Sequence, residues 1–226
     1  MRLDTLTGME YALITKRLAL CPVTAADHPA LLAHWTLPDV RRFLFDGEAL
    51  SAAEVSKTIE DSVSDFAAGG YGIWLIREHR QVDAAGPELA GPELAGPELA
   101  GTVGLRPLDD TGLEIFYSLA PGSWGRGYAT EAARAVLAHA LGTHRLPEVL
   151  AEVDEGNTAS VAVVKRLGMV PFAVVPGELG PMTRYRTPPE PRSRASAPAR
   201  GGRVRLAPRV RKVSVPELGV FSVCPE

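Results

Sequence analysis

The stretch from Gly122 to Glu131 constrains the fold most, because closely spaced glycines there join a strand-like pattern to a helix-like pattern. Before it, two sets of residues alternate with period 2, which is the pattern of a strand with two different faces. One set is Leu113, Ile115, Tyr117 and Leu119, and the other is Glu114, Phe116 and Ser118. After it, an Ala-rich run repeats apolar residues at helical spacing. The first amides of a helix lack internal partners and lie at the positive end of its dipole, so the sequence predicts an anion-binding loop. The expected loop residues are Trp124, Gly125, Arg126, Gly127, Tyr128, Ala129 and Thr130.

Glycines before a helix are weak evidence of binding by themselves, since many such loops only turn the chain and cap the helix. The spacing also differs from that of the common nucleotide loops. Gly127 is followed by Ala129 rather than by a third glycine, and no Gly-Lys-Ser/Thr follows. A second motif adds the specificity that the first one lacks. About thirty residues later, Asn157-Thr-Ala-Ser160 opens another helical run, which ends in Leu167-Gly168-Met169.

Together, Trp124-x-x-Gly127-x-Ala129, Asn157-x-x-Ser160 and Leu167-Gly168-Met169 resemble the GNAT superfamily of acetyl-coenzyme A (acetyl-CoA) dependent N-acetyltransferases. Within it, Trp-Gly-Arg-Gly-Tyr-Ala-Thr-Glu-Ala and Asn-x-Ala-Ser resemble the ribosomal-protein-alanine acetyltransferase subfamily. The resemblance spans roughly residues 12 to 187, and it departs from the superfamily at Trp124, where Gln or Arg is common. It implies one mixed α/β domain of the GNAT type, with flanking helices and a mostly antiparallel sheet that contains one parallel, splayed strand pair.

The resemblance also implies acetyl-CoA as a co-substrate, and no metal. Pantetheine would pair with strand backbone around Ser118 and Leu119, and the diphosphate would reach the loop from Trp124 to Thr130. Asn157 would bind the coenzyme, although capping the helix explains this residue equally well. Ser160 would lie near the sulfur. Many members carry a tyrosine as general acid where this chain has Val164, so Ser160 or water must serve here.

Glu114 is the candidate general base, because an acid on an otherwise apolar strand beside the coenzyme needs a reason to be there. A solvated glutamate at a sheet edge is the equally plausible alternative. The acceptor pocket is expected to involve Trp35, Asp39, Phe43 and Phe45, although aromatic residues near helix ends usually belong to the core.

The composition narrows the class of protein. The net charge is −3, but residues 188–226 carry +5 and the remainder −8, which disfavours nucleic-acid binding by the body and is compatible with a cationic amine acceptor. Two cysteines far apart imply no disulfide framework. The five histidines show no metal-ligand spacing. No signal-like or membrane-spanning run occurs, so we expect a cytoplasmic protein without membrane contact, either a monomer or a homodimer.

The pattern along the chain predicts one domain over residues 1–187. Predicted strands cover residues 11–21, 72–77, 101–106, 113–119, 148–153, 170–175 and 182–186, and helices start at Thr24, Ser51, Tyr128 and Asn157. The segment from Asp39 to Gly47 is predicted to be an irregular connection. Residues 86–100 repeat Gly-Pro-Glu-Leu-Ala three times, which predicts an expanded, exposed hairpin loop. The Pro- and Arg-rich residues 188–226 are predicted to be a disordered tail.

The resulting prediction is acetyl transfer from acetyl-CoA to a primary amine, most plausibly the α-amine of a peptide or protein N-terminus. A small-molecule acetyltransferase acting on an aminoglycoside or polyamine is the nearest rival. A non-catalytic coenzyme A binding module is a rival of another class, suggested by Val164 in place of the tyrosine.

Overall fold

A computed structural model describes residues 10–79, 95–108 and 111–188, which form one compact unit. The predicted tail and the first two Gly-Pro-Glu-Leu-Ala units, apart from Ala95, lie outside these residues. Within the described part, no helix combines the length and the apolar character needed to cross a membrane.

The centre of the fold is an eight-stranded sheet in the order β1-β2-β3-β4-β5-β6-β8-β7. All pairs are antiparallel except β5 with β6. The strands are β1 (Leu13–Ile14), β2 (Leu18–Pro22), β3 (Ile73–His79), β4 (Ala95–Leu108), β5 (Gly112–Leu119), β6 (Leu150–Asp154), β7 (Val170–Gly177) and β8 (Gly180–Arg186).

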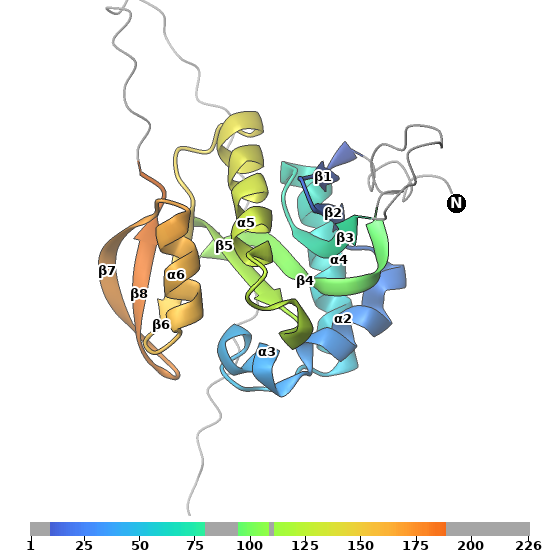
Figure 1. Ribbon diagram of the computed structural model, residues 1–226, viewed down its shortest axis with the longest axis horizontal. Coiled ribbons are helices and arrows are strands. Elements are labelled where there is room, and N and C mark those ends of the chain that lie inside the picture. Colours follow the sequence, from blue (N-terminus) through green and yellow to red (C-terminus); the bar gives the residue numbers. More distant parts are fainter. Residues whose placement is uncertain (1–9, 80–94, 109–110, 189–226) are drawn as a thin grey trace, which may run out of the picture. The chain divides into compact units, whose positions relative to one another are not determined.

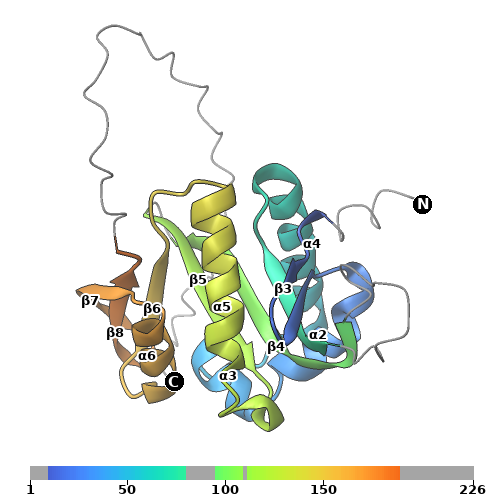
Figure 2. The same ribbon diagram turned by 45° about the horizontal axis from the view of Figure 1, so that its top comes forward.

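Helices cover both faces of this sheet. Figures 1 and 2 show α5 and α6 on one face and α4 on the other. The helical elements are η1 (Ala25–Asp27), α2 (His28–Trp35), α3 (Pro38–Leu44), α4 (Ala52–Gly69), η3 (Pro121–Ser123), α5 (Tyr128–Ala138), η4 (His139–Thr143) and α6 (Thr158–Arg166). The predicted caps are confirmed: Ser51 and Glu54 form a reciprocal capping box, and the Asn157 side chain accepts a hydrogen bond from Ser160 N.

Two apolar cores explain why the helices lie where they do. The larger one packs α5 residues such as Tyr128 and Val136 against Leu20, Trp74 and Ile115 of the sheet. The smaller one packs the apolar residues of α2, α3 and α4 against β3. Alternating strand residues therefore enter different cores, as the period-2 pattern predicts.

The pairing of β5 with β6 is limited to the start of both strands. Only Glu114 and Leu150 are in register, and beyond this point no pair joins the two strands. In contrast, the whole of β5 pairs with β4, from Leu119 opposite Gly101 to Gly112 opposite Leu108. The expected parallel, splayed pair is therefore present, and with it the expected fold class is confirmed.

Three segments differ from the predictions. Residues 11–21, expected to be one strand, form the antiparallel pair of β1 and β2, because the chain turns between them and Thr15 N donates to the Leu18 carbonyl oxygen. Residues 38–44, expected to be an irregular connection, form helix α3, because Pro38 occupies the first turn of a new helix, where its missing N–H costs nothing. Strand β4 begins at Ala95 and so includes the third Gly-Pro-Glu-Leu-Ala unit, with Leu99 in register with Arg77. Pro97 is tolerated there near a shift in the β3–β4 register, and its carbonyl accepts a hydrogen bond from the Arg77 side chain.

Candidate active site

The loop at residues 124–130, called here the glycine loop, connects the end of β5 to α5. Gly125 and Gly127 adopt φ angles of +72° and +78°, in the left-handed region that side chains disfavour. A Cβ at Gly125 would meet no atom within 4 Å, and one at Gly127 would meet only the Arg17 side chain, at 3.6 Å. The glycines therefore leave open space directly in front of the N-terminus of α5.

An ion-pair cluster holds the glycine loop against the β1–β2 turn. Glu131 accepts hydrogen bonds from Thr15 Oγ1 at 2.7 Å, from Arg17 N at 2.9 Å and from Arg17 Nε at 2.7 Å. Arg17 Nη1 also donates to the Arg126 carbonyl oxygen at 2.8 Å. Burial tends to raise the pKa of Glu131, but these hydrogen bonds outweigh it and lower the pKa. Glu131 thus stays ionised and positions the first turn of α5.

A cavity of about 1330 Å³ runs from the glycine loop into the gap between β5 and β6. Its lining includes most of the residues that the sequence singles out. These are Glu114, Ser118, Leu119, Trp124, Gly125, Gly127, Tyr128, Ala129, Thr130, Asn157 and Ser160, together with Asp39 and Phe43 of α3.

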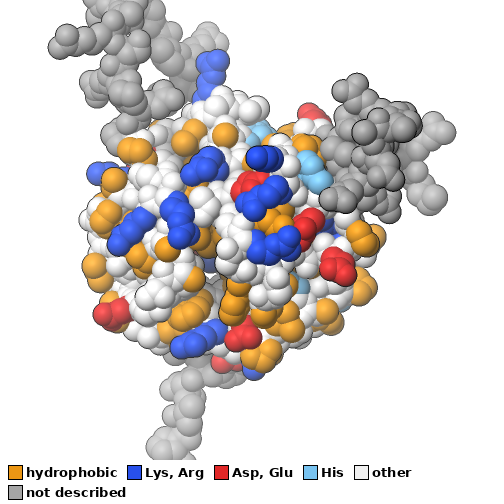
Figure 3. Space-filling view, in the orientation of Figure 1, with side chains coloured by type: hydrophobic (Ala, Val, Ile, Leu, Met, Phe, Trp, Pro, Cys, Tyr) orange, Lys and Arg blue, Asp and Glu red, His pale blue; other side chains and the backbone are white. Residues whose placement is uncertain are grey.

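Polar groups suited to an anion face this cavity at the glycine loop. The hydroxyl of Thr130 is buried and has no hydrogen-bond partner among the described residues, although it lines the cavity. The first amides of α5 have no intrahelical acceptors. Arg134 and Arg166 also line the cavity, and Figure 3 shows Lys and Arg side chains gathered on the face that carries α5 and α6. This end fits a phosphate-bearing ligand of coenzyme size.

Arg126 does not line the cavity. Its guanidinium forms an ion pair with Glu78 of β3 and lies over the Tyr128 ring, 4.6 Å from the ring centroid. The glycine loop therefore presents its backbone, rather than this side chain, to the cavity. Trp124 is half exposed, and its indole N–H donates to the Leu119 carbonyl at 2.9 Å, which fixes the loop to the end of β5.

Glu114 is buried on β5 beside the cavity. Its carboxylate forms an ion pair with Arg106 of β4, with Oε1 and Nε 2.7 Å apart. Burial raises the pKa of Glu114, while the Arg106 guanidinium acts in the opposite direction. The solvated edge position that the sequence left open is therefore wrong for this side chain, which is 4% exposed.

Ser118 belongs to a buried network at the end of β5. Its hydroxyl is 2.8 Å from His34 Nε2 and 2.8 Å from the Thr102 hydroxyl, and Trp35 Nε1 donates to Thr102 at 3.4 Å. Burial lowers the pKa of His34 to about 4, so the imidazole is neutral near pH 7. The network joins α2 to β4 and to the part of β5 that no longer pairs with β6.

Ser160 and Tyr117 meet on the other side of the gap. Ser160 lies in the first turn of α6, and the Tyr117 hydroxyl donates to its carbonyl oxygen at 3.3 Å. Burial raises the pKa of Tyr117 to about 12, so this hydroxyl stays protonated. Val164, at the position where the resemblance leads one to expect a tyrosine, is fully buried in the larger core.

Two of the four residues expected in the acceptor pocket lie elsewhere. Trp35 is 1% exposed and packs edge-to-face on Phe45, with ring centroids 5.3 Å apart, and both belong to the smaller core. The reason is the direction of α2, which turns this aromatic face toward the sheet. Asp39 and Phe43, on α3, do line the cavity.

Several cavity residues were missed by sequence reasoning. Tyr117 occupies an alternating position of a predicted strand, which favours the core, and Arg106 and Asp46 carried no signal because their position depends on tertiary packing. Asp154 could have been found from the sequence, because it directly follows a predicted strand. Ligands often bind at the carboxyl ends of parallel strands that separate from each other.

Comparisons with known proteins agree with this geometry. The family model described as an acetyltransferase (GNAT) domain matches residues 17–170. Among curated proteins, the uncharacterized protein YkkB of Bacillus subtilis (strain 168) is 41% identical to this chain over 61 residues. That match covers 27% of this chain, and the chain spans about a third of the length of YkkB, or 36%.

Solved structures with the same fold include several acetyltransferases. The acetyltransferase from Agrobacterium tumefaciens str. C58 is 25% identical with a TM-score of 0.61, over 77% of this chain and 92% of that one. RimL, a ribosomal L7/L12 α-N-protein acetyltransferase in complex with coenzyme A, is 16% identical with a TM-score of 0.61. The match covers 77% of this chain and 96% of RimL. The microcin C7 self-immunity acetyltransferase MccE, in complex with acetyl-CoA and AMP, is 15% identical with a TM-score of 0.58. The match covers 76% of this chain and 93% of the MccE chain.

Proposed function

This chain belongs to the GNAT acetyltransferase family, and we propose that it transfers the acetyl group of acetyl-CoA to the α-amine of a peptide or protein N-terminus. One observation carries the proposal: a single cavity connects the N-terminus of α5 to the buried carboxylate of Glu114 across the gap between β5 and β6. Donor and acceptor would meet in that gap.

The glycine loop is the proposed site of the coenzyme diphosphate. Backbone amides at the start of α5 would donate to phosphate oxygens, and Thr130 Oγ1 would gain the partner that it lacks. Pantetheine would follow the free edge of β5 past Leu119 and Ser118, where β6 no longer occupies the backbone groups. Asn157, which already caps α6, would bind the pantetheine from the opposite side.

Glu114 is the proposed base. The ammonium of the acceptor loses a proton to the carboxylate, directly or through a water, and the neutral nitrogen attacks the thioester carbonyl carbon. The carbon–sulfur bond then breaks, and the second proton that the nitrogen loses reaches the sulfur through the Ser160 hydroxyl or a water, which is left unchanged. Because burial raises the pKa of Glu114, its carboxylate is a stronger base than an exposed one.

The preference for an α-amine follows from ordinary pKa values. At pH 7 about 10 to 15% of an α-amine is neutral, but only about 0.04% of a lysine side chain. A lysine acetyltransferase must recover this difference, on the order of 3.5 kcal/mol, with a strong base or by desolvation. Here the only proposed base already shares its charge with Arg106. The thiol leaving group, with a pKa of about 8.5 by analogy with cysteine, needs little help.

The test compares two peptides that differ only at the N-terminus and at one side chain. One carries a free N-terminus and no lysine, and the other carries an acetylated N-terminus and one lysine. Release of free thiol from acetyl-CoA is followed near neutral pH, and mass spectrometry locates the added acetyl group. We expect the free N-terminus to react at least about tenfold faster. Equal rates on the two peptides would refute the α-amine preference, and no reaction on either would refute peptide acetylation.

A further inference from the structure

Three carboxylates of the sheet face the same side of the cavity, and within the described part of the chain two of them have a cationic partner and the third has none. Glu114 pairs with Arg106 at 2.7 Å, and Glu152 pairs with Arg184 at 2.5 Å. Asp154 lies two residues after Glu152 on β6 and therefore shares its face of the sheet. Its Oδ1 is buried and has no hydrogen-bond partner among the described residues.

Asp154 is also nearly inaccessible, since its exposed fraction is 7%, yet it lines the cavity. A buried carboxylate oxygen without a partner is costly unless a ligand supplies one. Burial raises the pKa of Asp154, and the nearby charge of Asp46 raises it further. Both effects oppose the ionised form, and a bound cation would reverse both.

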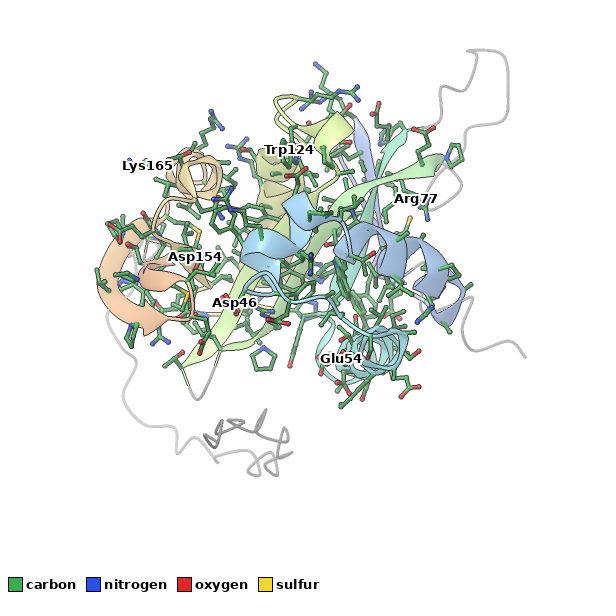
Figure 4. The ribbon with its side chains drawn as sticks, turned by 90° about the horizontal axis from the view of Figure 1, so that it is seen from below. Asp46, Glu54, Arg77, Trp124, Asp154 and Lys165 are labelled. Carbon is green, nitrogen blue, oxygen red and sulfur yellow. The ribbon has the colours of Figure 1, made fainter. Side chains whose placement is uncertain are left out.

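Asp46 comes from a different element, the segment that follows α3. It is exposed, lines the same cavity and forms no ion pair with another described residue. Figure 4 shows Asp46 and Asp154 near each other, with Trp124 of the glycine loop apart from them. We call Asp46, Glu152 and Asp154 the acidic end of the cavity. Two of its three carboxylates, those of Asp46 and Asp154, form no ion pair with any residue that the structure describes.

The spacing along β6 separates this site from the proposed base. Glu114 is in register with Leu150, and Asp154 lies four residues further along the strand. At about 3.3 Å per residue this is about 13 Å, too far for one nitrogen to contact both carboxylates. No group of three or more His, Cys, Asp or Glu among the described residues could hold a metal ion. The occupant that fits is an organic ammonium or guanidinium.

We propose that Asp154 and Asp46 bind a second cationic group of the acceptor, so that the preferred acceptor carries two positive charges, one on the reacting amine and one at the acidic end. This inference rests on the proposed function, because it assigns the reacting amine to Glu114. The second cation has two possible sources, a basic side chain following a peptide N-terminus or the distal nitrogen of a small diamine.

The experiment uses acceptors that differ in one charge. The first pair is an Ala-Lys and an Ala-norleucine peptide, and the second is a short diamine and the monoamine of the same chain length. Asp154→Asn removes the charge at nearly constant volume, and Asp46→Asn tests the exposed partner. Glu155→Gln is the matched control, because Glu155 is the next residue, is exposed and does not line the cavity. Thermal unfolding of each variant verifies that it folds.

We expect kcat/KM of the unaltered protein to be about tenfold higher for the dication of at least one pair, as loss of one charged hydrogen bond implies. Asp154→Asn should remove that preference and leave the monocation within about twofold. The pair that responds identifies the source of the cation. The proposal is overturned if neither pair shows a preference, or if Asp154→Asn slows the monocation equally, since Asp154 would then serve the reacting amine.

Calorimetry separates this inference from the proposed function. Binding of each acceptor is measured with coenzyme A in place of acetyl-CoA, so that no transfer occurs. Binding of the dication that depends on Asp154, without any acetylation of α-amines, would refute the proposed function and support the acidic end. Acetylation of α-amines with equal binding of dication and monocation would support the proposed function and refute the acidic end as a cation site.

Discussion

The glycine loop and the acidic end line one cavity, but they are assembled in opposite ways. The glycine loop consists of seven consecutive residues, 124–130, whose conformation depends on two glycines with positive φ. The acidic end combines Asp154 of β6 with Asp46, more than a hundred residues earlier in the chain. A local motif can present backbone amides to an anion by itself, whereas placing two carboxylates together requires the whole fold.

This difference gives the two ends different sensitivities. A backbone change should damage the glycine loop, a change of charge should damage the acidic end, and loss of the packing beneath β5 should damage both. The four predictions below separate these cases, beginning with the largest expected effect.

The network around Ser118 holds α2 against β4 and β5 beside the cavity, and protonation of His34 should weaken it. The pKa of His34 is about 4 in the folded protein and about 6.5 in the unfolded chain, so only the unfolded chain takes up a proton between these values. Stability is therefore fully present above pH 6.5 and falls as the pH drops toward 4. The loss is about 3 kcal/mol at most.

Urea unfolding across this pH range tests the prediction against His34→Gln, which cannot titrate. The variant should be less stable near pH 7 but should lose less stability on acidification. Parallel pH dependences for the two proteins would show that His34 is not the titrating group.

Gly127→Val should impair the glycine loop alone. A β-branched residue is strained at φ +78°, and its side chain would occupy the space in front of α5. If about two charge-assisted hydrogen bonds to phosphate are lost, acetyl-CoA binds about a hundredfold more weakly. Calorimetry measures this affinity. Gly122→Ala is the control, because a Cβ at Gly122 would meet nothing within 4 Å and the residue does not line the cavity. Unchanged affinity in Gly127→Val would remove the glycine loop from the coenzyme site.

Glu114→Gln should slow turnover while leaving acetyl-CoA affinity intact. We expect a loss of about tenfold near pH 7, and less above pH 8, where the α-amine is already largely neutral. The raised pKa of Glu114 gives the direction, since its basic form is gained as the pH rises and lost on acidification. The pH dependence of kcat/KM on a free N-terminal peptide provides the measurement, with Glu60→Gln on the exposed face of α4 as the control. A profile with the same shape in both variants would mean that Glu114 is not the base.

Tyr117→Phe should have the smallest effect. The Tyr117 hydroxyl makes one long hydrogen bond, 3.3 Å, to the Ser160 carbonyl. Its loss is worth roughly 0.5 to 1 kcal/mol, or about a threefold lower kcat. Steady-state kinetics suffices to measure it. A decrease of a hundredfold or more would instead identify Tyr117 as the proton donor to the sulfur, in place of Ser160 or water.

The same contrast explains what the sequence could predict. The fold, the parallel β5–β6 pair and the lining positions of the glycine loop follow from alternation, helical spacing and contiguous motifs, and so does the cap at Asn157. Helix α3 was missed because Pro38 is a stop signal in one context and a first-turn residue in another. Trp35 and Phe45 were misplaced, and Asp46 was overlooked, because side-chain direction in the α2–α4 region depends on packing against β3 and β4.

A crystal structure of the protein with coenzyme A tests the central assignment most directly. The account predicts the diphosphate at roughly 3 Å from backbone N–H groups between Gly125 and Thr130, with pantetheine along β5 at Ser118 and Leu119, and the thiol in the gap before β6. A diphosphate bound away from the glycine loop, or a coenzyme that leaves the β5–β6 gap empty, would contradict it.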